Sequence, residues 1–218
     1  MPQTIDRSQW ANRFVRNILL WIVPVAAVWL VITPVYNPFL TKATENLVRL
    51  IEDPASTRLV EKETHHFIIT RTDLPSRALS SVRVTDAHFP LILTGVLFLA
   101  VPGLTFRRRL ENLGWATLVS VFFHILLLFL WVQFIYATQL GRFSAENYTP
   151  FAREAWGLAK HLADLPFKFS LPLVLWSIFY LRELFGTPKP AVKASAKPAV
   201  KTPAVKAAKP GKASKKKA

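Results

Sequence analysis

Long apolar runs alternate with polar segments along the first 185 residues of the chain. A helix of about twenty apolar residues crosses a hydrocarbon core of about 30 Å. Each run is close to that length, so the pattern predicts an α-helical integral membrane protein with a four-helix transmembrane bundle. The predicted spans are residues 17–35, 88–106, 115–138 and 169–185.

Lysine and arginine distinguish the two sides of the predicted bundle, because short cytoplasmic loops are enriched in these residues. Three arginines precede the first span, three more separate the second span from the third, and a lysine-rich tail follows the fourth. With four crossings, these positions fall on one side. We therefore expect a protein of the bacterial inner (plasma) membrane with both termini in the cytoplasm.

The segments between the predicted spans are assigned to the two sides on this basis. The cytoplasmic segments are the N-terminus at 1–16, a basic turn at 107–114 and a disordered tail at 186–218, and the outside segments are 36–87 and 139–168. The first span could instead be a signal peptide that starts with Arg7, Arg13 and Arg16. Its apolar run is longer than a typical signal core, and NPFL rather than a small-residue cleavage site follows it.

The first outside segment is predicted to form a small α+β unit. Asn37-Pro38 has the form of a helix N-cap followed by proline at the first helical position, and apolar residues then recur at helical spacing. TRLVEK, HHFIITR and SSVRVT have the β-branched content of strands, with LPSRA as a turn. In the second outside segment, residues 147–165 mix aromatic and polar side chains, as expected for an interfacial helix lying in the headgroup layer.

The net charge of +15 is concentrated in the tail, where ten lysines occur without any acidic residue. Alanine, lysine and proline dominate this segment, and such a composition predicts disorder. These lysines could bind anionic lipid or nucleic acid, or they could serve only solubility and orientation. They are Lys189, Lys193, Lys197, Lys201, Lys206, Lys209, Lys212, Lys215, Lys216 and Lys217.

The sequence contains no cysteine, which excludes thiol nucleophiles, disulfides and iron–sulfur clusters. It also lacks the GxSxG, HExxH, P-loop and GxGxxG patterns. Carboxylate pairs are missing from the predicted spans, which weakens an interpretation as a transporter or pump. We therefore expect neither a catalytic residue set nor a metal or cofactor site.

His124 is the most informative single residue, because an ionisable group in the middle of a span usually faces the bundle interior or a water-filled cavity. Gln133 lies nine residues further on, about two and a half turns, and is expected on roughly the same face. The pair could serve a proton-coupled carrier or a membrane enzyme. A neutral histidine that is hydrogen-bonded to a neighbouring helix explains the residue equally well.

Two further polar pairs are expected to have structural rather than chemical roles. His65 and His66 are adjacent on a predicted strand, so they point to opposite faces and do not readily share one metal ion. Asp86 and His88 could form an acid–base pair, but polar residues commonly mark the end of a span.

The layout resembles that of small accessory membrane proteins associated with exosortases, which are bacterial multi-pass proteins encoded beside a sorting transpeptidase. The resemblance rests on the mixed outside segment and on the local sequences TPVYNPFL, HFPLILTGVLFLAVP and RRRLENLGW. It implies a non-enzymatic accessory or assembly protein in envelope protein sorting or export, with another membrane protein as its partner. Exosortases use a cysteine nucleophile, so this chain is not the transpeptidase itself.

Three functions follow as hypotheses from these observations. The first is the accessory or assembly protein, the second is a proton-coupled carrier or membrane enzyme that uses His124, and the third is a membrane tether that binds anionic lipid or nucleic acid through the tail.

Overall fold

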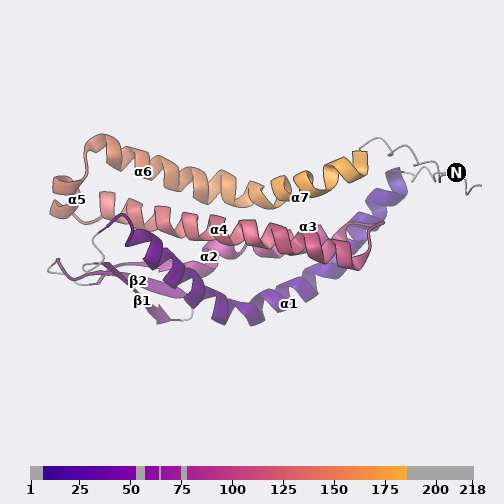
Figure 1. Cartoon of the computed structure of the whole chain (residues 1–218), viewed down its shortest axis with the longest axis horizontal. Coiled ribbons are helices and arrows are strands. Elements are labelled where there is room, and N and C mark those ends of the chain that lie inside the picture. The colour runs from indigo at the N-terminus through magenta and orange to yellow at the C-terminus, as the bar shows by residue number, and fades with distance from the viewer. Residues whose placement is uncertain (1–6, 53–56, 64, 75–77, 186–218) are drawn as a thin grey trace, which may run out of the picture. The chain divides into compact units, whose positions relative to one another are not determined.

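Most of the described chain is helical, and a small three-stranded antiparallel sheet accompanies the helices (Figure 1). The computed structural model describes residues 7–52, 57–63, 65–74 and 78–185. Within these residues, the helical segments that are long and apolar enough to cross a membrane are Ser8–Val48, Phe106–Thr138 and Pro150–Leu181. The prediction of a mostly helical protein with a small α+β part is confirmed. The predicted tail lies outside the described residues.

Helix α1 (Arg7–Val48) is one continuous helix of 42 residues, about 60 Å long. It contains the first predicted span, but it does not restart at Asn37-Pro38, so the prediction of a separate second helix is wrong. Pro38 cannot donate a hydrogen bond to the carbonyl of Pro34, and such a loss bends a helix without ending it when packing holds both halves. Asn37 and Leu40 are buried, which supplies that packing, and α1 is visibly curved (Figure 1).

The sheet has the order β1-β2-β3, with strands at Thr57–Glu63, His66–Arg71 and Ala78–Arg83. The three predicted strands are therefore confirmed, and they pair in chain order as an antiparallel meander. Along β2 every second residue is buried, as expected for a strand with one face on a core. Phe67 and Ile69 on this face join Leu59 of β1 and Val82 of β3 in a hydrophobic core.

The second predicted span, residues 88–106, has the wrong bounds and is interrupted, because the helical residues are 84–88 and 91–100 and residues 101–105 form a turn. Helix α2 (Val84–His88) ends before Pro90, which cannot donate a helical hydrogen bond, and α3 (Leu91–Ala100) continues the chain. Together they form an apolar segment that is shorter than the three long ones. Helix α3 packs closely against α1 at Gly95, where an added Cβ would lie 2.7 Å from Cγ1 of Val25.

Helix α4 (Phe106–Thr138) contains the third predicted span and ends at the predicted residue. The predicted basic turn at 107–114 is wrong, because these residues form the first turns of α4 and the chain reverses before them. Thr105 caps the helix by accepting a hydrogen bond from the backbone N–H of Arg108. Arg109 donates to the carbonyl of Leu99 at 2.8 Å and so ties this basic end to α3.

The last helical elements follow one another almost without a break. After α5 (Arg142–Asn147) come α6 (Pro150–Leu162), the π-helical turn η1 (Ala163–Phe167) and α7 (Lys168–Phe185). Helix α7 matches the fourth predicted span. Helix α6 packs along α4 (Figure 1), so it does not form the separate interfacial helix that the sequence predicts.

Exposed apolar side chains are concentrated in part of the helical region. They extend from Val15 to Val35 on α1, from Leu110 to Leu126 on α4 and from Leu165 to Leu181 on η1 and α7. We call this region the apolar band. Beyond Leu126, the interior-facing residues of α4 are buried in the core under the sheet. We call this second region the sheet unit. It comprises residues 36–48, the sheet, α2, residues 127–138, α5 and α6.

Candidate functional site

His88 is the centre of a buried hydrogen-bonded cluster that links α1 to α2. Its Nδ1 accepts a hydrogen bond from Nε1 of Trp29 at 3.0 Å, and its Nε2 lies 2.6 Å from Oδ1 of Asn37. An indole N–H can only donate, so Nδ1 carries no hydrogen, and the neutral ring donates from Nε2 to Asn37. Asn37 then donates to the hydroxyl of Thr85 at 3.3 Å, and Thr85 contacts exposed His65. The chain of bonds thus runs from the interior to the surface.

His124 lies beside this cluster and is also buried. Its Nδ1 is 2.9 Å from the hydroxyl of Tyr36, and its ring centre is 6.3 Å from that of His88. The Tyr36 ring meets the His88 ring edge-on at 5.0 Å. The cluster therefore connects α1, α2 and α4 at the boundary between the apolar band and the sheet unit. His88 and His124 stand out in the sequence, but no local pattern marks their partners, which are Trp29 and Asn37 for His88 and Tyr36 for His124.

Gln133 does not belong to the His124 cluster, and the prediction of a shared face is wrong. Nine residues at 100° each leave the two side chains about half a turn apart. The side chain of Gln133 instead lies beside Tyr148, with Oε1 3.4 Å from the Tyr148 hydroxyl. Its Nε2 is buried without a hydrogen-bond partner in the described part of the chain.

If His124 is a structural residue, asparagine should replace it with little loss. The asparagine amide can still bond the Tyr36 hydroxyl, whereas His124→Ala leaves that hydroxyl unsatisfied and should cost about 1–3 kcal/mol. The measurements are the thermal unfolding midpoint in mild detergent and proton flux in reconstituted vesicles. Proton flux that is present in the wild type and lost in His124→Asn would instead establish the carrier hypothesis.

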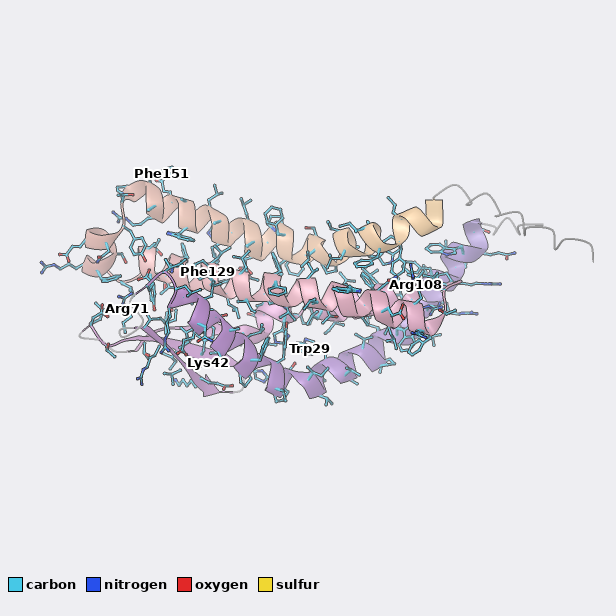
Figure 2. The ribbon with its side chains drawn as sticks, viewed as in Figure 1. Trp29, Lys42, Arg71, Arg108, Phe129 and Phe151 are labelled. Atoms are coloured by element: carbon cyan, nitrogen blue, oxygen red, sulfur yellow. The ribbon has the colours of Figure 1, made fainter. Side chains whose placement is uncertain are left out.

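A second polar cluster holds the far end of the sheet unit together around Arg71 (Figure 2). The guanidinium donates two hydrogen bonds to Asp73, at 3.0 and 2.9 Å, and one to Glu52 at 3.2 Å. It also lies over the rings of Tyr136 and Phe143, at 4.8 and 4.3 Å from their centres. Arg71 therefore joins the turn after α1, the sheet, α4 and α5.

The Arg71 cluster also perturbs the pKa values of its members. Burial and the nearby Glu52 carboxylate raise the pKa of Tyr148, whose hydroxyl donates to Glu52 at 2.7 Å. The hydrogen bonds from Arg71 lower the pKa of Asp73. A carboxylate whose pKa is lower in the folded than in the unfolded protein stabilises the fold at pH values above the unfolded-state pKa. That contribution is lost as the pH falls through the folded-state pKa.

Acid should therefore weaken the sheet unit partly through Asp73. We expect the thermal midpoint of the wild type to fall as the pH is lowered from neutral to about 3, beyond the ordinary aspartate pKa of about 4. Asp73→Asn should be less stable at neutral pH and should lose less on acidification. Asp86→Asn, which alters an exposed carboxylate, is the control and should retain the wild-type dependence. Equal acid dependence of Asp73→Asn and wild type would refute this role of Asp73.

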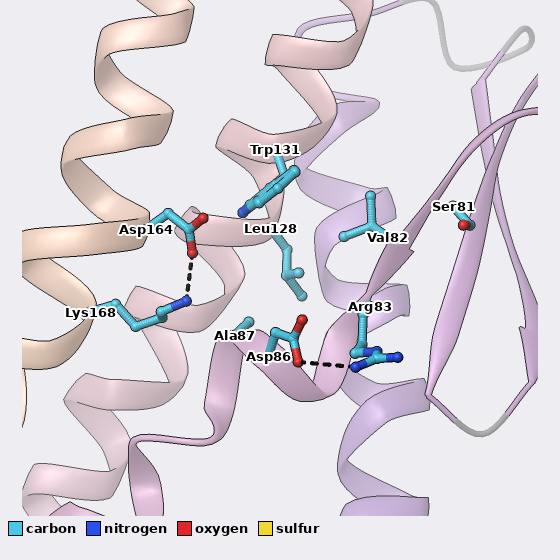
Figure 3. A pocket seen from close by; sticks show the side chains of 9 residues that line it. All are labelled: Ser81, Val82, Arg83, Asp86, Ala87, Leu128, Trp131, Asp164 and Lys168. Atoms are coloured by element: carbon cyan, nitrogen blue, oxygen red, sulfur yellow. Dashed lines mark hydrogen bonds and ion pairs between the residues drawn. The ribbon is translucent and has the colours of Figure 1, made fainter.

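A small pocket with polar walls lies between α2 and the start of α7, and residues of α4 also line it (Figure 3). Its volume is about 170 Å³. Two ion pairs face each other across it: Arg83 with Asp86 at 4.0 Å, and Lys168 with Asp164 at 2.6 Å. The lining residues are Ser81, Val82, Arg83, Asp86, Ala87, Leu128, Trp131, Asp164 and Lys168.

Asp164 also pairs with Lys160 at 3.6 Å, and the ammonium of Lys160 lies 3.6 Å from the centre of the Trp131 ring. Lys160, Asp164 and Lys168 are spaced four residues apart, so a helix places them on one face. That spacing is visible in the sequence and could have identified the group. Their burial could not be predicted, because charged residues on a helix usually face solvent.

The other candidate residues that the structure describes lie at or near the surface rather than inside the buried clusters. His65 is exposed and contacts Thr85, while His66 lies at the start of β2 and accepts from Arg83 at 3.4 Å. Asp86 pairs with Arg83 and does not bond His88. The ten tail lysines lie outside the described residues, and their binding of polyanions stays a prediction.

Comparison with known protein families, with curated proteins and with solved structures found no match. The interpretation of function therefore rests on the residues and geometry of this chain.

Proposed function

We propose that this protein is a non-enzymatic accessory or assembly factor that crosses the bacterial inner membrane four times, with both termini in the cytoplasm and the sheet unit outside. The basic residues at the start of α1 and α4 support this orientation, since Arg108 lies at the end of α4 opposite to Arg71 (Figure 2). The second crossing would use Val84–Ala100, which spans about 25 Å as a helix. Such a crossing is slightly short, and local thinning of the bilayer accommodates it.

The observation that carries the proposal is the outward face of α6, where apolar residues are exposed although Lys160 on the same helix is buried. Glu154 is also exposed on this helix. Phe151 and Leu158 are 81% and 62% exposed, whereas Lys160 is only 7% exposed. Phe151 is directed away from the helical bundle (Figure 2). Leu162, Leu165 and Phe169 continue the exposed apolar stripe at helical spacing into α7.

The length of this stripe indicates a protein partner in addition to lipid. From Phe151 to Leu181 the helical chain is about 46 Å long, whereas the hydrocarbon core is about 30 Å thick. The Phe151 end therefore extends beyond the lipid chains, where exposed apolar surface is best covered by another protein. A partner within an exosortase-type sorting or export system would agree with the resemblance in sequence layout.

The buried polar clusters favour a binding role over catalysis. The bonds of His88 run to Trp29 and Asn37, and Arg71 bonds to Asp73 and Glu52, so these groups hold elements together. Neither cluster lines the pocket at α2 and α7.

Site-specific photocrosslinking in cells tests the proposal. A photoreactive residue at Leu158 should give a protein adduct of defined mass that co-purifies in mild detergent. A matched probe at Val31, which is exposed within the apolar band of α1, should crosslink lipid and give no protein adduct. Recovery of the uncrosslinked protein alone from the Leu158 probe would count against a partner. An adduct of twice the chain mass would assign the stripe to self-association instead.

A further inference from the structure

The pocket between α2 and α7 has more positive than negative charge once the buried Lys160 beside it is included. Arg83 and Lys168 line it, Lys160 lies behind Asp164, and the carboxylates are Asp86 and Asp164. In the described part of the chain, Asp164 is the only carboxylate within 4.0 Å of either lysine. One carboxylate therefore compensates two buried ammonium groups.

A buried cation without full compensation is costly, so this arrangement favours an anion as a third partner. Lys160 is already satisfied in part by the face of the Trp131 ring. Lys168 is nine-tenths buried and lines the pocket itself. Arg83 lies on the opposite wall, where it pairs with exposed Asp86 at 4.0 Å and donates from Nε to His66 at 3.4 Å. Both contacts are long, so a phosphate can compete for its guanidinium.

The size of the pocket limits what it accepts. Its volume of about 170 Å³ is below the 300–1,000 Å³ typical of sites for drug-sized molecules. A phosphate group with a few attached atoms fits this volume, and phosphate is the anion that arginine and lysine together bind well.

The position of the pocket indicates where such a phosphate comes from. The pocket-lining residues Asp164 and Lys168 alternate along the chain with Leu165, Phe167 and Phe169, whose side chains are exposed. These belong to the apolar band, so the pocket lies at the edge of that band. Lipid headgroups occupy the same level of a bilayer.

We propose that this pocket binds the phosphate of a phospholipid headgroup, held between Lys168 and Arg83. The wide turn of η1 directs Asp164 and Lys168 toward the pocket while its apolar residues face outward, and π-helical turns occur frequently at functional sites. Asp86 remains to accept a hydrogen bond from a headgroup hydroxyl or ammonium. No residue that lines the pocket belongs to the exposed apolar stripe, so lipid binding and crosslinking to protein test different side chains.

Native mass spectrometry of the full-length, delipidated protein provides the test. The probes are dihexanoylphosphatidylglycerol, dihexanoylglycerol, glycerol 3-phosphate and inorganic phosphate, at about 0.15 M salt to screen exposed charges. We expect saturable binding of the phospholipid, at least tenfold weaker binding of dihexanoylglycerol, and weak binding of the two water-soluble phosphates. Losing one charge-assisted hydrogen bond in Lys168→Gln or Arg83→Gln should weaken phospholipid binding roughly tenfold.

The control is Lys42→Gln, which removes an exposed lysine from an ion pair on α1 and keeps the tail unchanged. It should bind the phospholipid as the wild type does. If Lys168→Gln fails to fold, the phospholipid affinity of Arg83→Gln decides the test, because Arg83 is exposed and its replacement leaves the core unchanged. Wild-type affinity in Arg83→Gln would overturn the proposal, as would equal binding of dihexanoylglycerol. Equally tight binding of inorganic phosphate and phospholipid would refute the assignment to a lipid.

Discussion

Replacing Arg71 with alanine is expected to destabilise the sheet unit by about 3 kcal/mol, because Glu52 and Asp73 would lose their common cationic partner. Breaking a buried ion pair by removing one member costs about 3–5 kcal/mol. We expect the low end of this range, because Asp73 is 38% exposed and water compensates part of its lost interaction with Arg71. The alanine would also remove the contacts between the guanidinium and the Tyr136 and Phe143 rings.

The measurement is the thermal unfolding midpoint in mild detergent, where we expect a fall on the order of 10 °C. Arg71→Lys should recover only part of the loss, because an ammonium does not bind Asp73 in a bidentate manner. Arg58→Ala, on the exposed side of the neighbouring strand, is the control and should stay within about 0.5 kcal/mol of the wild type. A midpoint of Arg71→Ala equal to that of Arg58→Ala would contradict the structural role of the cluster.

His88→Ala should have an effect of similar size for a different reason. The substitution leaves the indole N–H of Trp29 and the side-chain oxygen of Asn37 without their partner, in a region from which water is excluded. Each of these two unsatisfied buried groups costs about 1–3 kcal/mol, so the expected total is about 2–6 kcal/mol.

His65→Ala is the matched control, since His65 stands at the exposed end of the same chain of hydrogen bonds. Its loss should change the stability by no more than about 0.5 kcal/mol. The measurements are the thermal unfolding midpoint of both variants and their accumulation in membranes. Only His88→Ala should show a clear loss. Equal stability of His88→Ala and His65→Ala would show that the buried cluster does not hold α1 against α2.

The periodicity of the sequence was sufficient to predict the long helices and the strands. Apolar runs of helical length predict α1, α4 and α7, and the β-branched stretches predict the three strands, because these signals are local. The boundaries that failed depend on tertiary contacts. Asn37-Pro38 has the local form of a helix start, but burial of Asn37 against His88 keeps α1 continuous through it.

The polar clusters could be predicted only in part, for the same reason. His124 stands out because a histidine in an apolar run is unusual, whereas its partner Tyr36 is 88 residues away in the chain. Arg71 has no distinguishing local pattern, and its partner Glu52 lies on another element. The charges of α6 and η1 do have a recognisable spacing, but their burial depends on how α6 packs against α4.

The orientation of the sheet unit relative to the basic helix ends is the central claim, and topology reporters test it most directly. Alkaline phosphatase, active only outside the cytoplasm, and a fluorescent protein, active only inside it, would be fused at matched positions. Fusions after Arg109 and after Gly186 should report the cytoplasm, and insertions within residues 56–79 should report the outside. A cytoplasmic signal from residues 56–79, with the same signal after Arg109, would contradict the four-crossing arrangement.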